Sequence, residues 1–221
     1  MIPLRDVIPS RTTPYITVTI IVLNAAAWFF ELSVPDEVLP VFLQVYGVVP
    51  AHFHALTLVT SMFLHGSWMH VIGNMWYLWI FGDNVEDELG HVRYLLFYLA
   101  CGWIATLTHA YLNSASNVPS IGASGAIAGV LGAYLLMFPH GRVLALVPFG
   151  FFTRITELPA LVVLGLWFVL QLFSGVATLG ARTAHSAGVA FWAHIGGFVA
   201  GVVLGAFLRR RPRVRRWDVP R

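Results

Sequence analysis

The sequence lacks lysine and has little charge of either sign. Only 10% of its 221 residues are charged, whereas an average soluble domain carries about 25%. Hydrophobic residues make up 58% of the chain, and the mean hydropathy is +0.77. These proportions exclude an ordinary soluble domain. They indicate an all-α, polytopic membrane protein with one compact helical domain.

The chain also has little with which to form cross-links or metal sites. Its single cysteine, Cys101, excludes an internal disulfide. The histidines at 52, 54, 65 and 70 could suggest a metal site, but no cysteine or carboxylate stands beside them at ligand spacing. We therefore expect no metal and no other cofactor.

Six apolar segments have the character of membrane spans. They cover residues 15–32, 68–82, 94–112, 124–138, 158–179 and 187–208. We expect a six-transmembrane-helix bundle over residues 15–208. A cytoplasmic N-terminal segment, 1–14, would precede it, and a basic cytoplasmic tail, 209–221, would follow it.

The arginines divide unevenly between the two sides of this topology. Twelve of the 13 fall on the side that holds both termini, and only Arg182 falls on the other. Because basic residues mark the cytoplasmic side, we expect a multi-pass protein of the cell membrane with both termini in the cytoplasm. The basic tail is then an anchor beside anionic lipid rather than a nucleic-acid site. Abundant arginine and alanine without lysine are typical of a GC-rich genome and favour a bacterial source.

Three connections between the segments stand out. Residues 34–55 form a long, fairly apolar external connection with three prolines, which we expect to lie partly in the membrane interface. Residues 177–187 form a second, polar external loop. Residues 143–154 form an apolar cytoplasmic loop to which the sequence assigns no role.

The fourth segment is too short to cross a membrane. Only 15 residues separate Ser124 from Pro139, so the helix is about 22 Å long against a hydrocarbon core of about 30 Å. Ser124 should therefore lie below the outer surface, and residues 113–123 must dip inward to reach it, lining a water-filled cavity. The same measure puts His194 and His70 at a similar depth, with Asn74 one turn below His70.

Glycines recur at every fourth position after both Ser124 and His194. They are Gly125 and Gly129 in the fourth segment, and Gly197, Gly201 and Gly205 in the sixth. Such stripes let membrane helices approach backbone to backbone. The spacing alone does not distinguish plain packing from a serine–histidine contact.

These residue types offer acyl-transfer chemistry. A serine hydroxyl needs a base to take its proton, and His194 is the best-placed base. His70, the Asn74 amide and the Ser124 N–H can donate to an oxyanion. Because no acid lies in the fourth or sixth segment, a Ser124–His194 dyad is implied. The plainer alternatives are a helix cap for Ser124 and a core or proton-relay histidine for His194.

Three motifs in this order resemble those of the rhomboid intramembrane serine proteases. Residues 122–125, Gly-Ala-Ser-Gly, are similar to the family's GxSG motif. Residues 193–197 with Gly201 resemble AHxxGxxxG on the last core helix, and His65, His70 and Asn74 match HxxxxHxxxN. The resemblance extends from the first segment to Gly205.

The resemblance implies a six-helix fold. It also implies that the protein cleaves peptide bonds of single-pass transmembrane proteins within or near their membrane segments. Ser124 would be the nucleophile and His194 the general base, while His70 and Asn74 would line the oxyanion hole. His65 matches a structural histidine, and Glu86 a structural acid. The expected partners are single-pass substrates and membrane lipid, with no nucleic acid and no metal.

Two features depart from the family pattern. The Trp-Arg pair common in the first external loop is not evident in residues 34–55, and Ala128 stands where some members place an aromatic residue on the catalytic histidine. The resemblance further suggests that substrate reaches the site laterally near the fifth segment, beneath the loop 177–187.

Two other function classes stay open. One is an inactive rhomboid-like protein that binds membrane helices, although such proteins usually lack the serine or the histidine. The other is a transporter or proton-relay protein, against which the absence of an inverted repeat and of a buried acid argues.

Overall fold

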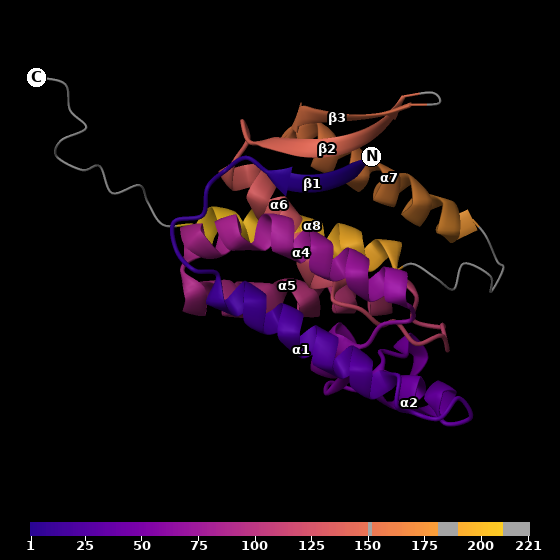
Figure 1. Cartoon of the computed structure of the whole chain (residues 1–221). Helices are drawn as coiled ribbons and strands as arrows, with labels where there is room; N and C mark the ends of the chain where they lie inside the picture. Colours follow the sequence, from indigo (N-terminus) through magenta and orange to yellow (C-terminus); the bar gives the residue numbers. More distant parts are fainter. Residues whose placement is uncertain (150–151, 181–189, 210–221) are drawn as a thin grey trace, which may run out of the picture.

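The computed structural model describes residues 1–149, 152–180 and 190–209. Six long helices coincide with the six predicted segments (Figure 1). They are α1 (Tyr15–Glu31), α4 (Trp68–Leu89), α5 (His91–Leu112), α6 (Ser124–Met137), α7 (Ala160–Gly180) and α8 (Phe191–Leu208). Only α4 runs well past its predicted end, because its polar last turns continue the helix until Gly90, with φ of 80°, ends it.

The helices differ in whether their length and composition suffice to cross a membrane. Among the described residues, α5 and α8 are long and apolar enough to span a bilayer. Shorter apolar helices cover Tyr15–Glu31, Ser124–Met137 and Ala160–Ser174. The protein is thus mostly helical, and six complete crossings stay a prediction.

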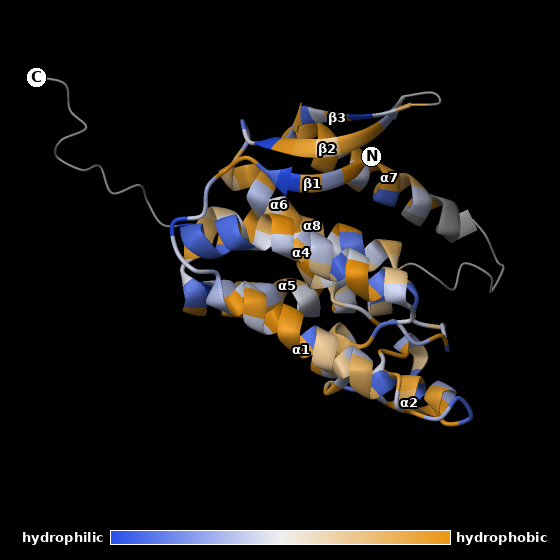
Figure 2. Cartoon of the chain, in the orientation of Figure 1, coloured by the Kyte–Doolittle hydropathy of each residue, from blue (hydrophilic) through white to orange (hydrophobic). Residues whose placement is uncertain are grey.

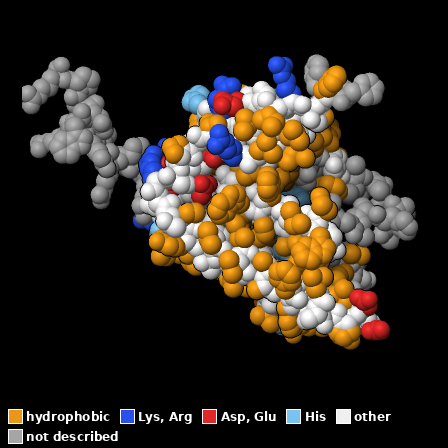
Figure 3. All heavy atoms as spheres, in the orientation of Figure 1, with side chains coloured by type: hydrophobic (Ala, Val, Ile, Leu, Met, Phe, Trp, Pro, Cys, Tyr) orange, Lys and Arg blue, Asp and Glu red, His pale blue; other side chains and the backbone are white. Residues whose placement is uncertain are grey.

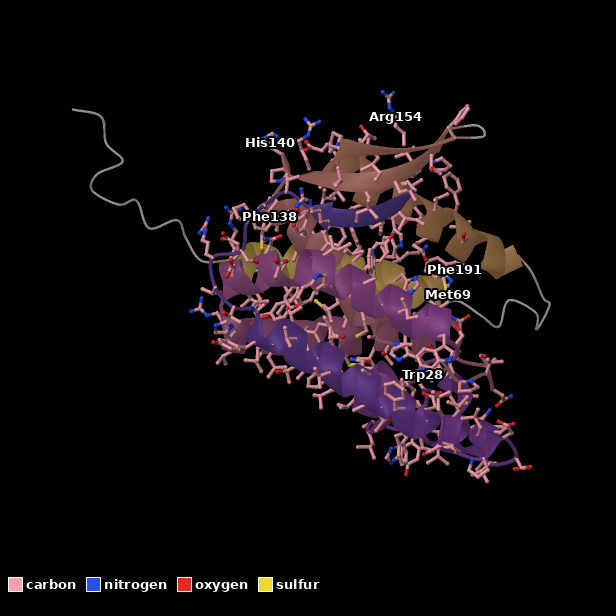
Figure 4. All side chains as sticks on the ribbon, viewed as in Figure 1. Trp28, Met69, Phe138, His140, Arg154 and Phe191 are labelled. Carbon is pink, nitrogen blue, oxygen red and sulfur yellow. The ribbon has the colours of Figure 1, made fainter. Side chains whose placement is uncertain are left out.

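The short helix α6 forms the centre of the bundle. All ten residues from Gly125 to Tyr134 are buried, and α6 contacts α4, α5 and α8. Figure 4 shows Phe138, just after α6, at the end of the bundle opposite Met69 and Phe191, which begin α4 and α8. Helix α6 therefore presents its first residue, Ser124, at the end of the bundle where α4 and α8 begin.

The glycine stripes of α6 and α8 face each other. A Cβ added to Gly197 would lie 2.0 Å from the Gly125 carbonyl oxygen, and one added to Gly201 would lie 1.9 Å from that of Gly129. No real side chain tolerates such distances, so the two backbones are in direct contact. This contact brings the beginning of α6 against the beginning of α8.

The prediction of a purely helical chain was wrong. A three-stranded antiparallel sheet, in the order β1-β2-β3, joins β1 (Ile2–Asp6), β2 (Arg142–Phe149) and β3 (Phe152–Pro159). It lies along one side of the bundle, where β1 contacts α4 and the other two strands contact α7 (Figure 1). The apolar run at 143–149 lacks the alternation of a half-exposed strand, so periodicity did not distinguish a strand from a loop.

The external connection contains short helices. They are α2 (Leu39–Tyr46), η1 (Pro50–His52), α3 (Thr57–Thr60) and η2 (Ser61–Phe63). Val41 and Val45 on α2 are about 60% exposed, and Figure 2 shows hydrophobic residues along this helix. An exposed apolar face is consistent with the predicted position in the membrane interface.

Acidic side chains at the end of α4 fasten the segment that precedes and begins α1. The Glu86 carboxylate is fully buried and accepts hydrogen bonds from the Ile16 N–H, the Thr17 N–H and the Thr17 hydroxyl at 2.8–2.9 Å. It also contacts His91 Nδ1 at 2.6 Å. Free N–H groups at a helix N-terminus attract negative charge. Glu86 therefore joins α1 to α4, as expected of a structural acid.

Replacing Glu86 with alanine should lower the free energy of unfolding by about 2–4 kcal/mol, because three buried donors lose their acceptor. Glu88→Ala is the matched control, since Glu88 makes only a 3.9 Å ion pair with the exposed Arg11. Its effect should stay within about 0.5 kcal/mol. Thermal unfolding in detergent measures both, and equal effects would contradict the role given to Glu86.

Asp6 on β1 makes the attachment of the sheet pH-dependent. Burial raises the pKa of its carboxyl from 3.8 to about 6. A hydrogen bond from the Tyr134 hydroxyl lowers this pKa, and the negative charge of the nearby Asp83 raises it further. Because the pKa is raised by folding, stability should be greatest below about pH 4 and fall as pH rises to about 6.

For a half-buried group, we expect this loss to be about 1 kcal/mol after solvent screening. Asp6→Asn should reduce the fall in stability between these pH values by this amount. Unfolding in detergent at pH 4 and pH 7 measures it, and an unchanged difference between the two pH values in Asp6→Asn would contradict the assignment.

Candidate active site

Ser124 and His194 are in direct contact although 70 residues separate them. The Ser124 hydroxyl oxygen lies 2.8 Å from His194 Nε2, within hydrogen-bond distance. His194 is 9% exposed and lies one turn into α8, whereas Ser124 begins α6. The glycine contact between the two helices starts at the next turn, so backbone packing and the side-chain contact support each other.

The loop before α6 is held inside the protein by backbone hydrogen bonds. Ser120 forms an isolated antiparallel bridge with Val48, and the Gly122 N–H donates to the Ser61 carbonyl at 2.8 Å. Irregular backbone within a bundle needs such partners. The loop thus reaches inward to deliver Ser124, as the short helix α6 requires.

Gly122 has a backbone conformation that other residues rarely adopt, with φ of 122°. A Cβ at this position would also lie 2.8 Å from His70 Nε2 and 3.7 Å from Asn74 Nδ2. The glycine therefore both turns the chain into α6 and lets these two side chains approach the loop two residues before Ser124.

The hydrogen bonds of His70 orient its ring. The Gly66 N–H donates to His70 Nδ1 over 3.4 Å, which leaves Nε2 as the protonated nitrogen. Because Nε2 faces Gly122, His70 presents a donor to the loop just before Ser124.

Asn74 is held by His65. Its Nδ2 donates to His65 Nε2 at 3.0 Å, and His65 Nδ1 then donates to the Phe63 carbonyl at 3.3 Å. The His65 backbone N–H bonds Glu31 at the end of α1. The second hydrogen of the Asn74 amide stays available beside Gly122. His65 thus has a structural position, and Glu31 is a support that the sequence did not reveal.

The Ser124 backbone N–H has no acceptor among the described residues. It is the first N–H of α6, where the positive end of the helix dipole lies. It can therefore serve as a third donor to a negative oxygen formed at Ser124.

A cavity of about 20 Å³ opens beside Ser124, which is room for one water molecule. Its polar lining includes the side chains of Ser61, Thr106, Ser120 and Ser124. A water held there would lie next to the serine within an otherwise apolar bundle.

Two residues of α7, Trp167 and Gln171, contact the His194 ring and were missed by the sequence reasoning. The Trp167 ring centroid lies 5.7 Å from that of His194, and Gln171 Oε1 lies 2.7 Å from His194 Nδ1. Ala128 is buried in the core. The ring is thus supported from α7. The feature of the sequence that could have revealed this support is Gln171, an amide side chain within the apolar segment 158–179.

The other sites considered from the sequence fall elsewhere. His52 lies in η1 and His54 just after it, both exposed. The described residues contain no group of three or more histidine, cysteine, aspartate or glutamate side chains that could hold a metal ion. The loop expected over the site lies mostly at 181–189, outside the described residues, as does the tail from 210.

Taken together, the arrangement supplies the parts of an acyl-transfer site. The serine hydroxyl lies within hydrogen-bond distance of an imidazole nitrogen, which is the arrangement that an activated nucleophile needs. Donors from three positions converge beside it: the Ser124 N–H, the His70 ring and the Asn74 amide.

Comparison with known proteins agrees with these motifs. The family model described as "Rhomboid domain" matches residues 52–211, which is most of the chain. Rhomboid protein 1, mitochondrial, of Saccharomyces cerevisiae is 30% identical over 182 residues, 76% of this chain and 47% of the yeast protein. Presenilin-associated rhomboid-like protein A, mitochondrial, of Danio rerio is 35% identical over 57% of this chain and 34% of its own length.

RHOMBOID-like protein 5 of Arabidopsis thaliana is 32% identical over 71% of this chain and 45% of its own length. The chain thus spans less than half of the length of these relatives. They come from yeast, fish and plant, and two are mitochondrial, so they do not support the expected bacterial source. The matched domain includes His65, His70, Asn74, Ser124 and His194. The chain belongs to the rhomboid family.

Proposed function

We propose that this protein is an intramembrane serine endopeptidase that cleaves single-pass transmembrane proteins within or near their membrane segment. The observation that carries the proposal is the 2.8 Å hydrogen bond between the Ser124 hydroxyl and His194 Nε2. Neither a helix cap nor a core histidine needs that contact, whereas a nucleophile and its base do.

In the proposed reaction, Ser124 Oγ attacks the carbonyl carbon of the substrate peptide while its proton passes to His194 Nε2. The negative oxygen of the tetrahedral intermediate accepts hydrogen bonds from His70 Nε2, the Asn74 amide and the Ser124 N–H. His194 then gives the proton to the leaving amine, and the peptide bond breaks. A water from the cavity beside Ser124 hydrolyses the acyl-enzyme, with His194 again acting as base.

We further propose that all six long helices lie in the membrane with both termini in the cytoplasm. Apolar side chains cover most of the visible face, and charges lie mostly near its margins (Figure 3). Twelve of 13 arginines fall on the side of the termini in this topology. The short α6 also fits, because its first residue is reached by a loop with paired backbone groups rather than by a full crossing.

An inactive, helix-binding rhomboid-like protein is the competing function. The complete serine–histidine contact favours the protease, since binding alone would not need an activated hydroxyl. A proton relay has less support, because among the described residues no carboxylate contacts either ring nitrogen of His194.

A fluorophosphonate probe and a cleavage assay together test the proposal. Purified protein in liposomes should cut single-pass substrates of differing sequence, and the probe should label Ser124 and stop cleavage. Mass spectrometry of the products identifies the cleaved bond, and mass spectrometry of the labelled peptide identifies the labelled residue. Folded protein that takes no label, while a known serine protease in the same liposomes does, would favour the binding function.

A further inference from the structure

Gln171 contacts the His194 nitrogen that faces away from Ser124. Its Oε1 lies 2.7 Å from His194 Nδ1, while Nε2 lies 2.8 Å from Ser124 Oγ. Both ring nitrogens therefore have one partner each, and the partners come from different helices, α7 and α6. The imidazole ring of His194 thus lies between the Gln171 amide and the Ser124 hydroxyl.

The identity of the amide atom decides which nitrogen carries the proton. A neutral imidazole has one N–H donor and one acceptor. Because the carbonyl oxygen of Gln171 can only accept, Nδ1 must donate to it, and Nε2 is left as the acceptor. A base that faces the Ser124 hydroxyl needs that arrangement. The other tautomer would place an N–H against the serine and leave it without a base.

The helix that carries Gln171 is placed by other contacts. Trp167, one turn earlier on the same face of α7, packs on His194, and its ring lies 6.3 Å from that of Phe198. Phe168 stacks on Phe198 at 4.5 Å. Aromatic packing thus fixes α7 against α8, and the polar role of Gln171 is separable from packing.

No charged acceptor competes for Nδ1 of His194. The ionisable groups that act on this ring are His70 on α4 and His109 on α5, and neither can accept as a carboxylate does. Among the described residues, no aspartate or glutamate bonds His194. The position that a carboxylate holds in a Ser-His-Asp triad is thus occupied by a neutral amide.

We propose that Gln171 is a positioning residue that holds His194 with its proton on Nδ1 and so keeps Nε2 ready to receive the Ser124 proton. The inference rests on the proposed protease function, because Gln171 acts through His194. It extends the dyad to a three-residue relay of amide, imidazole and hydroxyl, in which the amide orients the base without adding charge.

Gln171→Met tests the polar role at nearly constant volume. We expect kcat to fall about 10- to 100-fold with KM unchanged, by analogy with metal-ligating histidines that lose the partner orienting the ring. Gln171→Glu keeps an acceptor at the same place, so it should retain the tautomer. Its acidic limb in the pH–rate profile should move to higher pH, because a carboxylate stabilises the imidazolium. Leu172→Ala, at the neighbouring exposed position of α7, should leave both kcat and the profile unchanged.

Nitrogen-15 NMR of histidine-labelled protein in detergent gives a readout that needs no substrate. The wild type should show His194 protonated on Nδ1, and Gln171→Met should show the proton shifted toward Nε2. Wild-type rate or an unchanged tautomer in Gln171→Met would overturn the inference, as would an unshifted pH profile in Gln171→Glu. If the wild type cleaves nothing while the tautomer still depends on Gln171, the proposed function fails and the positioning role stands.

Discussion

Replacing Ser124 with alanine should abolish peptide-bond cleavage. The substitution removes the hydroxyl that contacts His194 Nε2, so no acyl-enzyme can form at this position. In enzymes with a serine nucleophile, loss of this group lowers kcat by about 10⁴-fold or more, and the residual rate reflects binding and the oxyanion donors alone. Initial rates with a single-pass substrate in liposomes measure the change.

The matched control is Ser33→Ala. Ser33 is also a serine beside a helix end, just after α1, but its hydroxyl is exposed and donates to the Phe30 carbonyl in the last turn of that helix. Its loss should leave the rate within about twofold, because isolated surface contacts contribute little. Thermal unfolding of both variants shows whether the fold is retained. Cleavage by Ser124→Ala at a rate near that of Ser33→Ala would exclude Ser124 as nucleophile.

The contact between the helices of Ser124 and His194 is a part of the site that the sequence predicts well, whereas the depth of Ser124 in the membrane stays a prediction. Helix rise and bilayer thickness are fixed quantities, so a segment ended by Pro139 limits how far its first residue lies from either surface. The glycine stripes then predict which two helices are neighbours, namely those that carry Ser124 and His194. In the structure, α6 and α8 meet along those glycines, and the two side chains lie within hydrogen-bond distance.

The support of His194 is the part that the sequence did not predict. Motif spacing describes residues on one helix, but Gln171 meets His194 only through the packing of α7 on α8. Nothing in a single sequence gives the rotation of one apolar helix against another when both are apolar all round. With Ala128 at the position where some relatives of the family carry an aromatic residue, the sequence leaves the support of the His194 ring open, and in the structure Trp167 packs on the ring from another helix.

The sheet was missed for a different reason. Strand β1 begins at Ile2 and β2 at Arg142, which is 140 positions later, so their pairing is long-range, whereas β2 and β3 follow each other in the sequence. Strand formation depends on such partners more than on local preference. The hydrogen bonds that join Glu86 of α4 to α1 and Asp6 of β1 to Tyr134 of α6 are equally tertiary effects. The sequence therefore described residues 1–14 only as a cytoplasmic segment.

Replacing Gly197 with alanine should have the second-largest effect, on stability as well as on activity. The added Cβ would lie 2.0 Å from the Gly125 carbonyl oxygen and 3.3 Å from Ala105. A backbone atom cannot give way as a flexible side chain does, so α8 must move away from α6. We expect the free energy of unfolding to fall by about 3 kcal/mol, at the upper end for overpacking. We expect cleavage to fall about 100-fold, since a shift of about 1 Å misaligns reacting groups.

Gly165→Ala on α7 is the control that separates crowding from helix propensity. A Cβ there would meet nothing within 4 Å, so the alanine should stabilise the helix by about 0.5–1 kcal/mol. The two substitutions are chemically identical, yet they should shift the unfolding midpoint in opposite directions and only Gly197→Ala should slow cleavage. Equal shifts would mean that α6 and α8 do not meet along their glycines. The serine–histidine contact would then lack the close helix approach on which its 2.8 Å length depends.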